Sequence, residues 1–296
     1  MLIGVKDHAA FPSSGWNTWW SLTGDVAIDP IVKAWRKAGL STDFEPDYTP
    51  PGTCLWRAVA TVASDKKILH RKMPNERNSW AIVREAIEGK HEDASFDYRP
   101  EFQVWLEGDE LNFHYRSQDP TGLAWAQEMA GFIEEKYEYY YDHYDVRAMS
   151  NWLVDIMTNY VHAVALRPRG GFYYVPPARA DLFFEILAVI EQTAPDHKLY
   201  KMPVVESSAD VAEAVLDALN AEATKVLTDI EEDIDKGIKK RAIRSRKERA
   251  EELYEKLGDY QGVLGDGLKN VLDQIIAVKA SLTEMEIVYE YDGLED

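Results

Sequence analysis

The densest group of reactive side chains in this sequence is a run of bases between residues 236 and 249, in which the only acid is Glu248. The bases are Lys236, Lys239, Lys240, Arg241, Arg244, Arg246, Lys247 and Arg249. Side chains of this type and density bind phosphate groups or an acidic partner. A solvated coiled-coil surface, whose bases pair with acids on a neighbouring helix, has the same composition. The sequence favours this second interpretation, because no aromatic residue that could stack on a nucleobase interrupts the run.

A second group combines acids with tyrosines between residues 134 and 145. Glu138, Asp142 and His143 are of the types that bind a metal ion. On a helix, however, Asp142 and His143 point about 100° apart, and the tyrosines fit a buried stripe. The sequence therefore favours a structural role for this group and predicts no metal site.

A third pattern matches, on paper, the Pro-Asp and Glu-x-Lys set of a metal-dependent nuclease. Its residues are Pro46, Asp47, Glu88 and Lys90. The spacing between the two pairs is long, and the first pair lies in a proline-rich loop. Short patterns of this kind arise by chance, so the nuclease is kept only as an alternative.

Cys54 could act as a nucleophile if His70 or His91 served as its base. A half-buried cysteine on a small helix is the simpler interpretation, and the sequence favours it. The chain has neither a Walker loop nor a dinucleotide fingerprint, since its glycine-rich stretch at residues 258–267 follows a helix rather than a strand. We therefore predict no cofactor, and an enzyme is the less favoured class.

Arg167 and Arg169 precede Gly170 and Gly171, whose amides could bind an anion. A Gly-Gly pair at a tight hairpin turn already has a structural reason, because the turn needs positive φ angles. The surrounding segment Leu166–Pro176, LRPRGGFYYVP, is followed by a helix and resembles a segment of an uncharacterised family found largely in bacteriophages and their hosts. The resemblance extends over the first two thirds of the chain. It implies a phage-type origin and no particular activity.

The overall composition bounds the class of protein. The 296 residues carry a formal charge of −19, which repels phosphate and argues against a general nucleic-acid binder. Cys54 is the only cysteine, so an intramolecular disulfide and a cysteine zinc cluster are impossible, and a reducing cytoplasm fits best. The first residues do not resemble a signal peptide, and no apolar run approaches the roughly 20 residues that cross a bilayer. We expect a cytoplasmic protein without a membrane partner.

Helices and strands intermix between residues 1 and 206. Helices are expected at 31–38, 53–63, 121–144, 146–160 and 181–192, and strands at 16–22, 80–87 and 199–205. One hairpin is predicted to join residues 102–106 to 111–115 through a Gly-Asp turn, and a second to join residues 162–166 to 172–175. Residues 71–72 are assigned to a basic loop. Because this order is not a regular βαβ repeat, the sequence predicts an α+β fold with helices packed on a mostly antiparallel sheet.

Residues 207–296 are predicted to form a long helical hairpin, a coiled-coil-like arm with an acidic tail. Apolar residues recur every three or four positions from Leu216 to Ile230 and again from Leu268 to Met285. The outgoing helix is expected to run from Ser208 to Leu257 with a local stutter after Ile234. Glycines between residues 258 and 267 mark the turn into the return helix.

The outgoing helix carries an apolar seam that the shorter return helix cannot cover along its whole length. The seam residues are Leu216, Leu219, Val226 and Ile230. They are expected to pack on the first domain or on a second copy of the chain. An antiparallel copy would bring the acids before Asp235 against the bases after it, so the sequence predicts a homo-oligomer.

No convergent catalytic site accompanies this charge-segregated arm. The sequence therefore favours a non-enzymatic cytoplasmic interaction protein that binds a protein partner through the arm or the acidic surface. One alternative is a metal-dependent hydrolase or nuclease. The other is a nucleic-acid-binding protein that uses residues 236–249.

Overall fold

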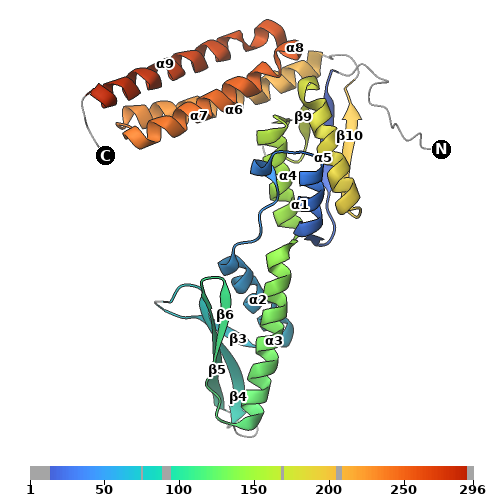
Figure 1. Ribbon diagram of the computed structural model, residues 1–296, viewed down its shortest axis with the longest axis vertical. Helices are drawn as coiled ribbons and strands as arrows, with labels where there is room; N and C mark the ends of the chain where they lie inside the picture. The colour runs from blue at the N-terminus through green and yellow to red at the C-terminus, as the bar shows by residue number, and fades with distance from the viewer. Residues whose placement is uncertain (1–13, 75, 89–94, 168–169, 205–208, 292–296) are drawn as a thin grey trace, which may run out of the picture. The chain divides into compact units, whose positions relative to one another are not determined.

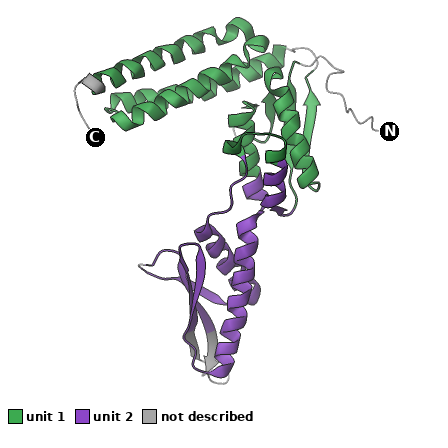
Figure 2. Ribbon diagram, viewed as in Figure 1, with its two compact units in different colours: residues 1–23, 35–44, 150–296 green, residues 24–34, 45–149 purple. Residues whose placement is uncertain are grey.

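The computed structural model describes residues 14–74, 76–88, 95–167, 170–204 and 209–291 (Figure 1). The chain is α+β, as predicted, and its sheets are antiparallel. It divides into two compact units, one of residues 1–23, 35–44 and 150–296 and the other of residues 24–34 and 45–149 (Figure 2). We call these unit 1 and unit 2. None of the helices in the described ranges has an apolar stretch sufficient to cross a lipid bilayer.

Unit 1 contains a four-stranded sheet in the order β10-β1-β9-β8. Its strands are β1 (Trp16–Ser21), β8 (Val164–Ala165), β9 (Tyr173–Val175) and β10 (Lys198–Pro203). The helix α5 (Ala180–Thr193) contacts one face, where the rings of Trp16 and Phe184 meet edge to face at 4.8 Å. Aromatic pairs of this geometry add to the free energy gained by burial.

The predicted hairpin at residues 162–175 is confirmed, with Val164 opposite Tyr174. Gly170 and Gly171 have φ angles of 67° and 82°, which is the structural reason expected for the pair. Arg169 lies outside the described residues. Arg167 donates hydrogen bonds from Nε and Nη2 to the Gly170 carbonyl at 3.2 and 3.1 Å, so its guanidinium holds the turn.

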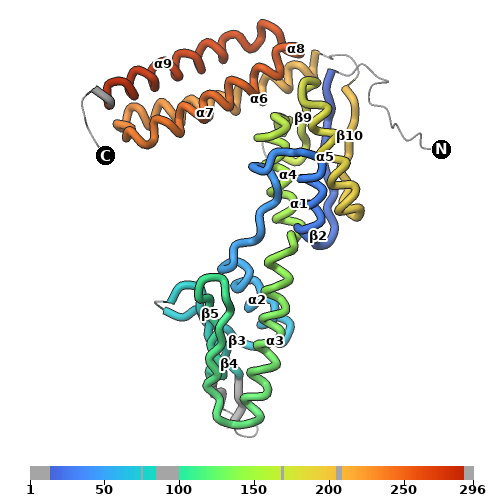
Figure 3. The backbone as a smooth tube through the Cα atoms, in the orientation of Figure 1, coloured from blue at the N-terminus to red at the C-terminus, as the bar shows by residue number. Residues whose placement is uncertain are grey.

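The C-terminal third is helical, as predicted, but its outgoing helix is two helices rather than one. Its elements are α6 (Ala209–Asp235), α7 (Lys240–Gly258), α8 (Gln261–Leu264), η6 (Gly265–Leu268) and α9 (Lys269–Tyr291). Gly237, with a φ of 79°, follows the end of α6, and its N–H donates to the Ile234 carbonyl. A glycine in this left-handed conformation is a usual helix stop. The chain then reverses, so α6, α7 and α9 form a three-helix bundle (Figure 3).

The bundle core covers the seam that we expected to need a partner. Leu219 and Ile230 are 1% and 0% exposed, and Leu216 and Val226 pack partly buried against the same cluster. The reversal at Gly237 brings α7 alongside α6, which is why the single chain covers this surface. The cluster also includes Val164 and Tyr174 from the sheet, so the bundle and the sheet lie in one unit. This division differs from the predicted domain boundary near residue 206.

Unit 2 contains a second four-stranded sheet in the order β3-β4-β5-β6, flanked in sequence by two helices. The elements are α2 (Pro51–Lys66), β3 (Leu69–Lys72), β4 (Ser79–Glu88), β5 (Ser95–Glu107), β6 (Glu110–Tyr115) and α3 (Pro120–Asp142). The hairpin between β5 and β6 is confirmed, with Glu107 opposite Glu110 and Gly108 at a φ of 65°. The assignment of residues 71–72 to a loop is wrong, because Arg71 pairs with Ala81 of β4.

The remaining elements are short. They are β2 (Val26–Ala27), α1 (Ile28–Lys37), η2 (Thr42–Phe44), β7 (His143–Tyr144), α4 (Val146–Asp155) with its π-helical continuation Ile156–Tyr160, and η5 (Pro177–Arg179). Asp145 caps α4, because its Oδ1 accepts the Ala148 N–H at 2.7 Å.

Candidate binding surface

Most bases of the segment 236–249 are neutralised within the bundle. Arg246 and Arg249 pair with Asp233 and Asp229 of α6 at 2.7 and 3.1 Å, and Lys247 pairs with Glu286 of α9 at 2.6 Å. Two further pairs, Lys236 with Glu232 and Arg244 with Glu248, lie within one helix or at its end. The bases that make no ion pair with a described residue are Lys239, Lys240 and Arg241. This arrangement matches the coiled-coil interpretation of the segment.

The other sites considered from the sequence do not assemble a reactive centre among the described residues. The Cys54 thiol is fully buried and donates to the Thr49 carbonyl at 3.3 Å, and burial raises its pKa to about 11. His70 lies exposed on β3, and His91 and Lys90 lie outside the described residues, as does the side chain of Glu88. A thiol with this pKa is almost wholly protonated at neutral pH and is a poor nucleophile.

The tyrosine and acid group at residues 134–145 makes a hydrogen-bonded cluster instead of a metal site. Tyr139 donates to Asp25 Oδ2 at 3.0 Å and Tyr144 to the Asp47 carbonyl at 2.7 Å. Asp142 Oδ1 lies 2.6 Å from His143 Nδ1. Among the residues that the structure describes, no three His, Cys, Asp or Glu side chains converge to hold a metal ion.

The sheet of unit 2 has one covered face and one open face. Alternate residues of β4 and β5, such as Trp80 and Phe102, form a buried core with α2 and α3. The residues between them point to the opposite side, where Ser79 lies beside Trp105 and Gln103 beside His114. No described helix of unit 2 contributes to a core on that side.

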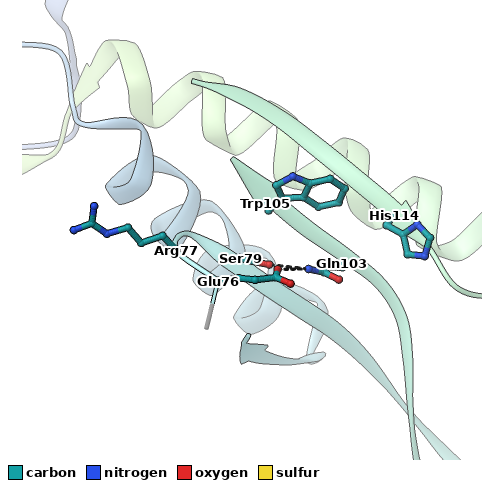
Figure 4. Close-up of a pocket in the computed structure, with 6 residues that line it drawn as sticks. All are labelled: Glu76, Arg77, Ser79, Gln103, Trp105 and His114. Carbon is teal, nitrogen blue, oxygen red and sulfur yellow. Dashed lines mark hydrogen bonds between the residues drawn. The ribbon is translucent and has the colours of Figure 1, made fainter. Parts of the chain in front are cut away.

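The open face contains a hollow of about 410 Å³ (Figure 4). It is lined by Glu76, Arg77, Ser79, Gln103, Trp105 and His114. Gln103 Nε2 donates to Glu76 Oε2 at 2.6 Å and to Ser79 Oγ at 3.0 Å, and its Oε1 accepts from Arg116 at 3.2 Å. The amide is therefore held in one orientation between an acid, a hydroxyl and a guanidinium, beside the half-buried Trp105 ring.

Exposed bases lie along the edge strand β3 of this sheet and in the segments that flank it, and Arg71 is the one of them that pairs with an open-face residue of β4. They are Lys67, His70, Arg71, Lys72 and Arg77, and we call them the basic edge. All four residues of β3 are exposed, and among the described strands it pairs only with β4. Within the described part of unit 2, no acid forms an ion pair with any of these side chains. The basic edge therefore presents uncompensated positive charge in a protein of net charge −19.

A second tryptophan lies on α2, one helical turn after the residue that contacts the loop joining β3 to β4. Asn78, at a φ of 52°, packs its side-chain amide so closely on Gly52 that a Cβ there would lie 2.8 Å from it. Trp56 is one turn further along α2 on the same side of the helix. Its side chain is 54% exposed, which is unusual for tryptophan.

The chain matches one protein family over residues 15–290, a range that includes most of both units. It belongs to DUF6744, a family of unknown function. No curated protein and no solved structure matches the chain. The surfaces of this DUF6744 protein therefore provide the evidence for its function.

A polar cluster in unit 1 was also missed by the sequence reasoning. His162, at a φ of 57°, places Nδ1 2.6 Å from Asp259 Oδ2, and Arg179 Nε donates to the same oxygen at 2.6 Å. A carboxylate only accepts hydrogen bonds, so this contact is a hydrogen bond when the proton is on Nδ1, whereas Arg179 Nη2, 3.1 Å from the same nitrogen, donates to it when the proton is on Nε2. Burial lowers the pKa of His162. Tyr260 donates to the His162 carbonyl at 2.6 Å, so the cluster ties the end of α7 to the start of β8.

The sequence reasoning noted Arg71 and Lys72 of the basic edge only as a basic loop and did not identify them as part of a binding surface, although a signal for it exists. Residues 66–77 contain five lysines and arginines and only one acid, Glu76. This run is shorter and less basic than the bundle segment, which has eight lysines and arginines and one acid in residues 236–249. The alternation of Gln103 and Trp105 with apolar residues on β5 shows that polar side chains occupy one face of the hairpin. The two signals together would have pointed to this surface.

Proposed function

We propose that this protein is a non-enzymatic binding protein that holds an anionic partner on the open sheet face and basic edge of unit 2. The observation that carries the proposal is the basic edge, because its exposed cations form no ion pair with any acid among the described residues. Elsewhere the protein is strongly acidic, so an anionic partner would be attracted to this edge and repelled from most other surfaces.

The hollow next to the basic edge supports the same proposal. Binding surfaces combine aromatic anchors with a few fixed polar groups. Trp105 and the Gln103 amide supply both within one hollow. Contacts by these side chains would add specificity to the charge attraction.

The bundle supports an interaction function less well than the sequence suggested. Its bases are mostly paired, and its apolar seam is covered within the chain. A second copy of the chain, a phage-type origin and a cytoplasmic location stay predictions. The single, buried cysteine is compatible with a reducing compartment.

Site-specific photo-crosslinking in the native host tests this proposal. A benzophenone amino acid replaces His114 on the open face, and a control variant carries it at Val288, which is 56% exposed on α9 of the bundle. We expect ultraviolet light to give discrete adducts from position 114 and none from position 288. Adducts from position 288 alone, or from neither position, would reject the open face as the binding surface.

A further inference from the structure

We infer that the anionic partner is a single-stranded nucleic acid, with phosphates along the basic edge and a base stacked on Trp105 in the hollow. The inference rests on the proposed function and names the class of ligand. It is a different site from the bundle segment 236–249 that the sequence suggested for nucleic acid. Three features of the open face carry it.

The first feature is the distance between the bases of the basic edge and the residues that line the hollow. Cross-strand register places Arg71, Ala81, Gln103 and His114 in one row across the four strands. Neighbours in such a row face the same side of the sheet. Arg71 and Gln103 are separated by two strand spacings, roughly 10 Å. This span is comparable with the reach from a phosphate to the far edge of its own base.

The second feature is the chemistry of the hollow. Trp105 provides a flat ring that can stack on any base, because every base has a π-face. Both N–H groups of the Gln103 amide are donated to Glu76 and Ser79, so the amide offers the edge of that base the second lone pair of its Oε1. Glu76 also lines the hollow and would repel a phosphate there, so the phosphates are expected on the basic edge and the neutral base in the hollow.

The third feature separates single strands from other polyanions. A duplex presents phosphates but hides the faces of its bases, so it would leave Trp105 without a stacking partner. An acidic protein supplies carboxylates but no regularly spaced flat rings. Only an unpaired strand satisfies the basic edge and the tryptophan together. The few cations of the edge limit the complex to about three or four phosphate contacts.

Fluorescence anisotropy with a labelled mixed-sequence oligonucleotide, on the full chain at about 50 mM salt, tests the inference. We expect binding that weakens with salt at a slope of roughly −0.7 per phosphate contact. Arg71→Glu combined with Lys72→Glu should weaken it more than tenfold, and Trp105→Ala about tenfold. Circular dichroism melting of each variant shows whether the fold is kept.

The matched control is Lys240→Glu combined with Arg241→Glu. It makes the same change of charge on α7, at bases that likewise have no ion pair with a described residue. Both variants lower the net charge of the protein by the same amount, so they share any general repulsion of the oligonucleotide. Apart from that shared effect, we expect the control to bind within about twofold of the unmodified protein. The inference is overturned if the control loses as much affinity as the edge variant, or if no oligonucleotide binds.

Two competitors identify the ligand class. A duplex of the same length that binds as tightly as the single strand, or Trp105→Ala binding like the unmodified protein, would overturn the stacked single strand. Polyglutamate that displaces the oligonucleotide at equal charge concentration would overturn the nucleic acid as partner. That last result would leave the proposed function intact, because photo-adducts at position 114 would still report an anionic protein partner.

Discussion

The bundle segment 236–249 and the basic edge of unit 2 have similar compositions and opposite surroundings. In the bundle, α7 lies against α6 and α9, and acids from both helices meet its bases at 2.6–3.1 Å. At the edge, β3 has only β4 as a neighbour in the sheet, and no described acid reaches its bases. The longer run of bases is therefore the less available one.

This difference shows that the number of packed neighbours decides whether a charge is available for binding. A base on a helix between two others lies within reach of two acidic surfaces. A base on an edge strand has one neighbour and faces solvent on its free side. If the comparison is correct, bases of the bundle affect stability and bases of the edge affect binding.

The largest effect on stability is expected at the most buried base of the bundle. Lys256 Nζ donates to both Glu222 oxygens at 2.9 and 3.0 Å and to the Thr158 carbonyl at 3.3 Å, and its side chain is 6% exposed. Removing one partner of a buried pair costs about 3–5 kcal/mol, which the 38% exposure of Glu222 reduces to about 2–3 kcal/mol for Lys256→Ala. Urea denaturation measures it, with Arg71→Ala as the control.

Arg71→Ala should change the free energy of unfolding by less than about 0.5 kcal/mol, because the side chain is exposed and has no ion pair in the described chain. If Lys256→Ala and Arg71→Ala lower the free energy of unfolding by similar amounts, the contrast between the bundle and the basic edge is wrong.

A smaller loss is expected when the paired bases are reversed. Arg246→Glu combined with Arg249→Glu replaces two attractions with two repulsions and should lower the free energy of unfolding by about 1–2 kcal/mol. The same charge change at Arg71 and Lys72, which are exposed on β3, should leave stability within about 0.5 kcal/mol. Thermal melting compares the two variants. Adding Asp233→Arg and Asp229→Arg to the first should restore most of its stability, and a failure to restore it would refute the pairing.

The helix reversal that creates these pairs depends on Gly237. Its φ of 79° is strained for any other residue, although a Cβ there would meet open space. Gly237→Ala should therefore cost about 1 kcal/mol through backbone strain alone. Gly258→Ala is the control, because Gly258 ends α7 without a positive φ and with equally open surroundings. Chemical denaturation that shows the greater loss for Gly258→Ala would contradict this account.

The smallest effect concerns pH. Burial lowers the pKa of His162 below its usual value of about 6.5, so the unfolded chain binds more protons than the folded one just below that pH. The stability that depends on neutral His162 is fully present above about pH 6.5. It falls as the pH drops towards the lowered pKa, by at most about 1.4 kcal/mol per pH unit.

Urea midpoints at pH 7.5, 6.5 and 5.5 measure the pH effect. His162→Asn retains a residue that tolerates the left-handed backbone and should flatten the loss between the two lower pH values. Burial also lowers the pKa of His197, so some dependence should remain in the variant. If His162→Asn loses stability with falling pH as steeply as the unmodified protein, the pH dependence arises from other groups.

The α+β class, both hairpins and the buried stripe of α9 could be predicted because their signals are local. Glycines with positive φ mark the turns at Gly108 and at Gly170 and Gly171, and Leu268, Ile275 and Leu282 lie on the buried side of the return segment as expected. Turn chemistry and apolar period depend only on neighbours in sequence.

Two elements were predicted incorrectly, each for a physical reason. The apolar steps of four after Ile234 fit a stutter as well as a helix end, and only the position of Gly237 distinguishes them. β3 has no alternating pattern to detect, because all four of its residues are exposed. The candidate surface depends on the same two elements. Which bases are paired could not be known before α7 was placed against α6.

The order of elements along the chain has a consequence for synthesis. Every strand of the unit 2 sheet lies between Leu69 and Tyr115, whereas β1 at Trp16 pairs with β10 at Pro203. Unit 2 can therefore leave the ribosome and fold while β1 still lacks its partner. At 5–20 residues per second, the chain from the end of unit 2 to β10 takes on the order of 3–10 s to make. During that interval the tryptophans of β1 are an exposed apolar segment, and a chaperone that masks them would help the nascent chain more than the finished protein.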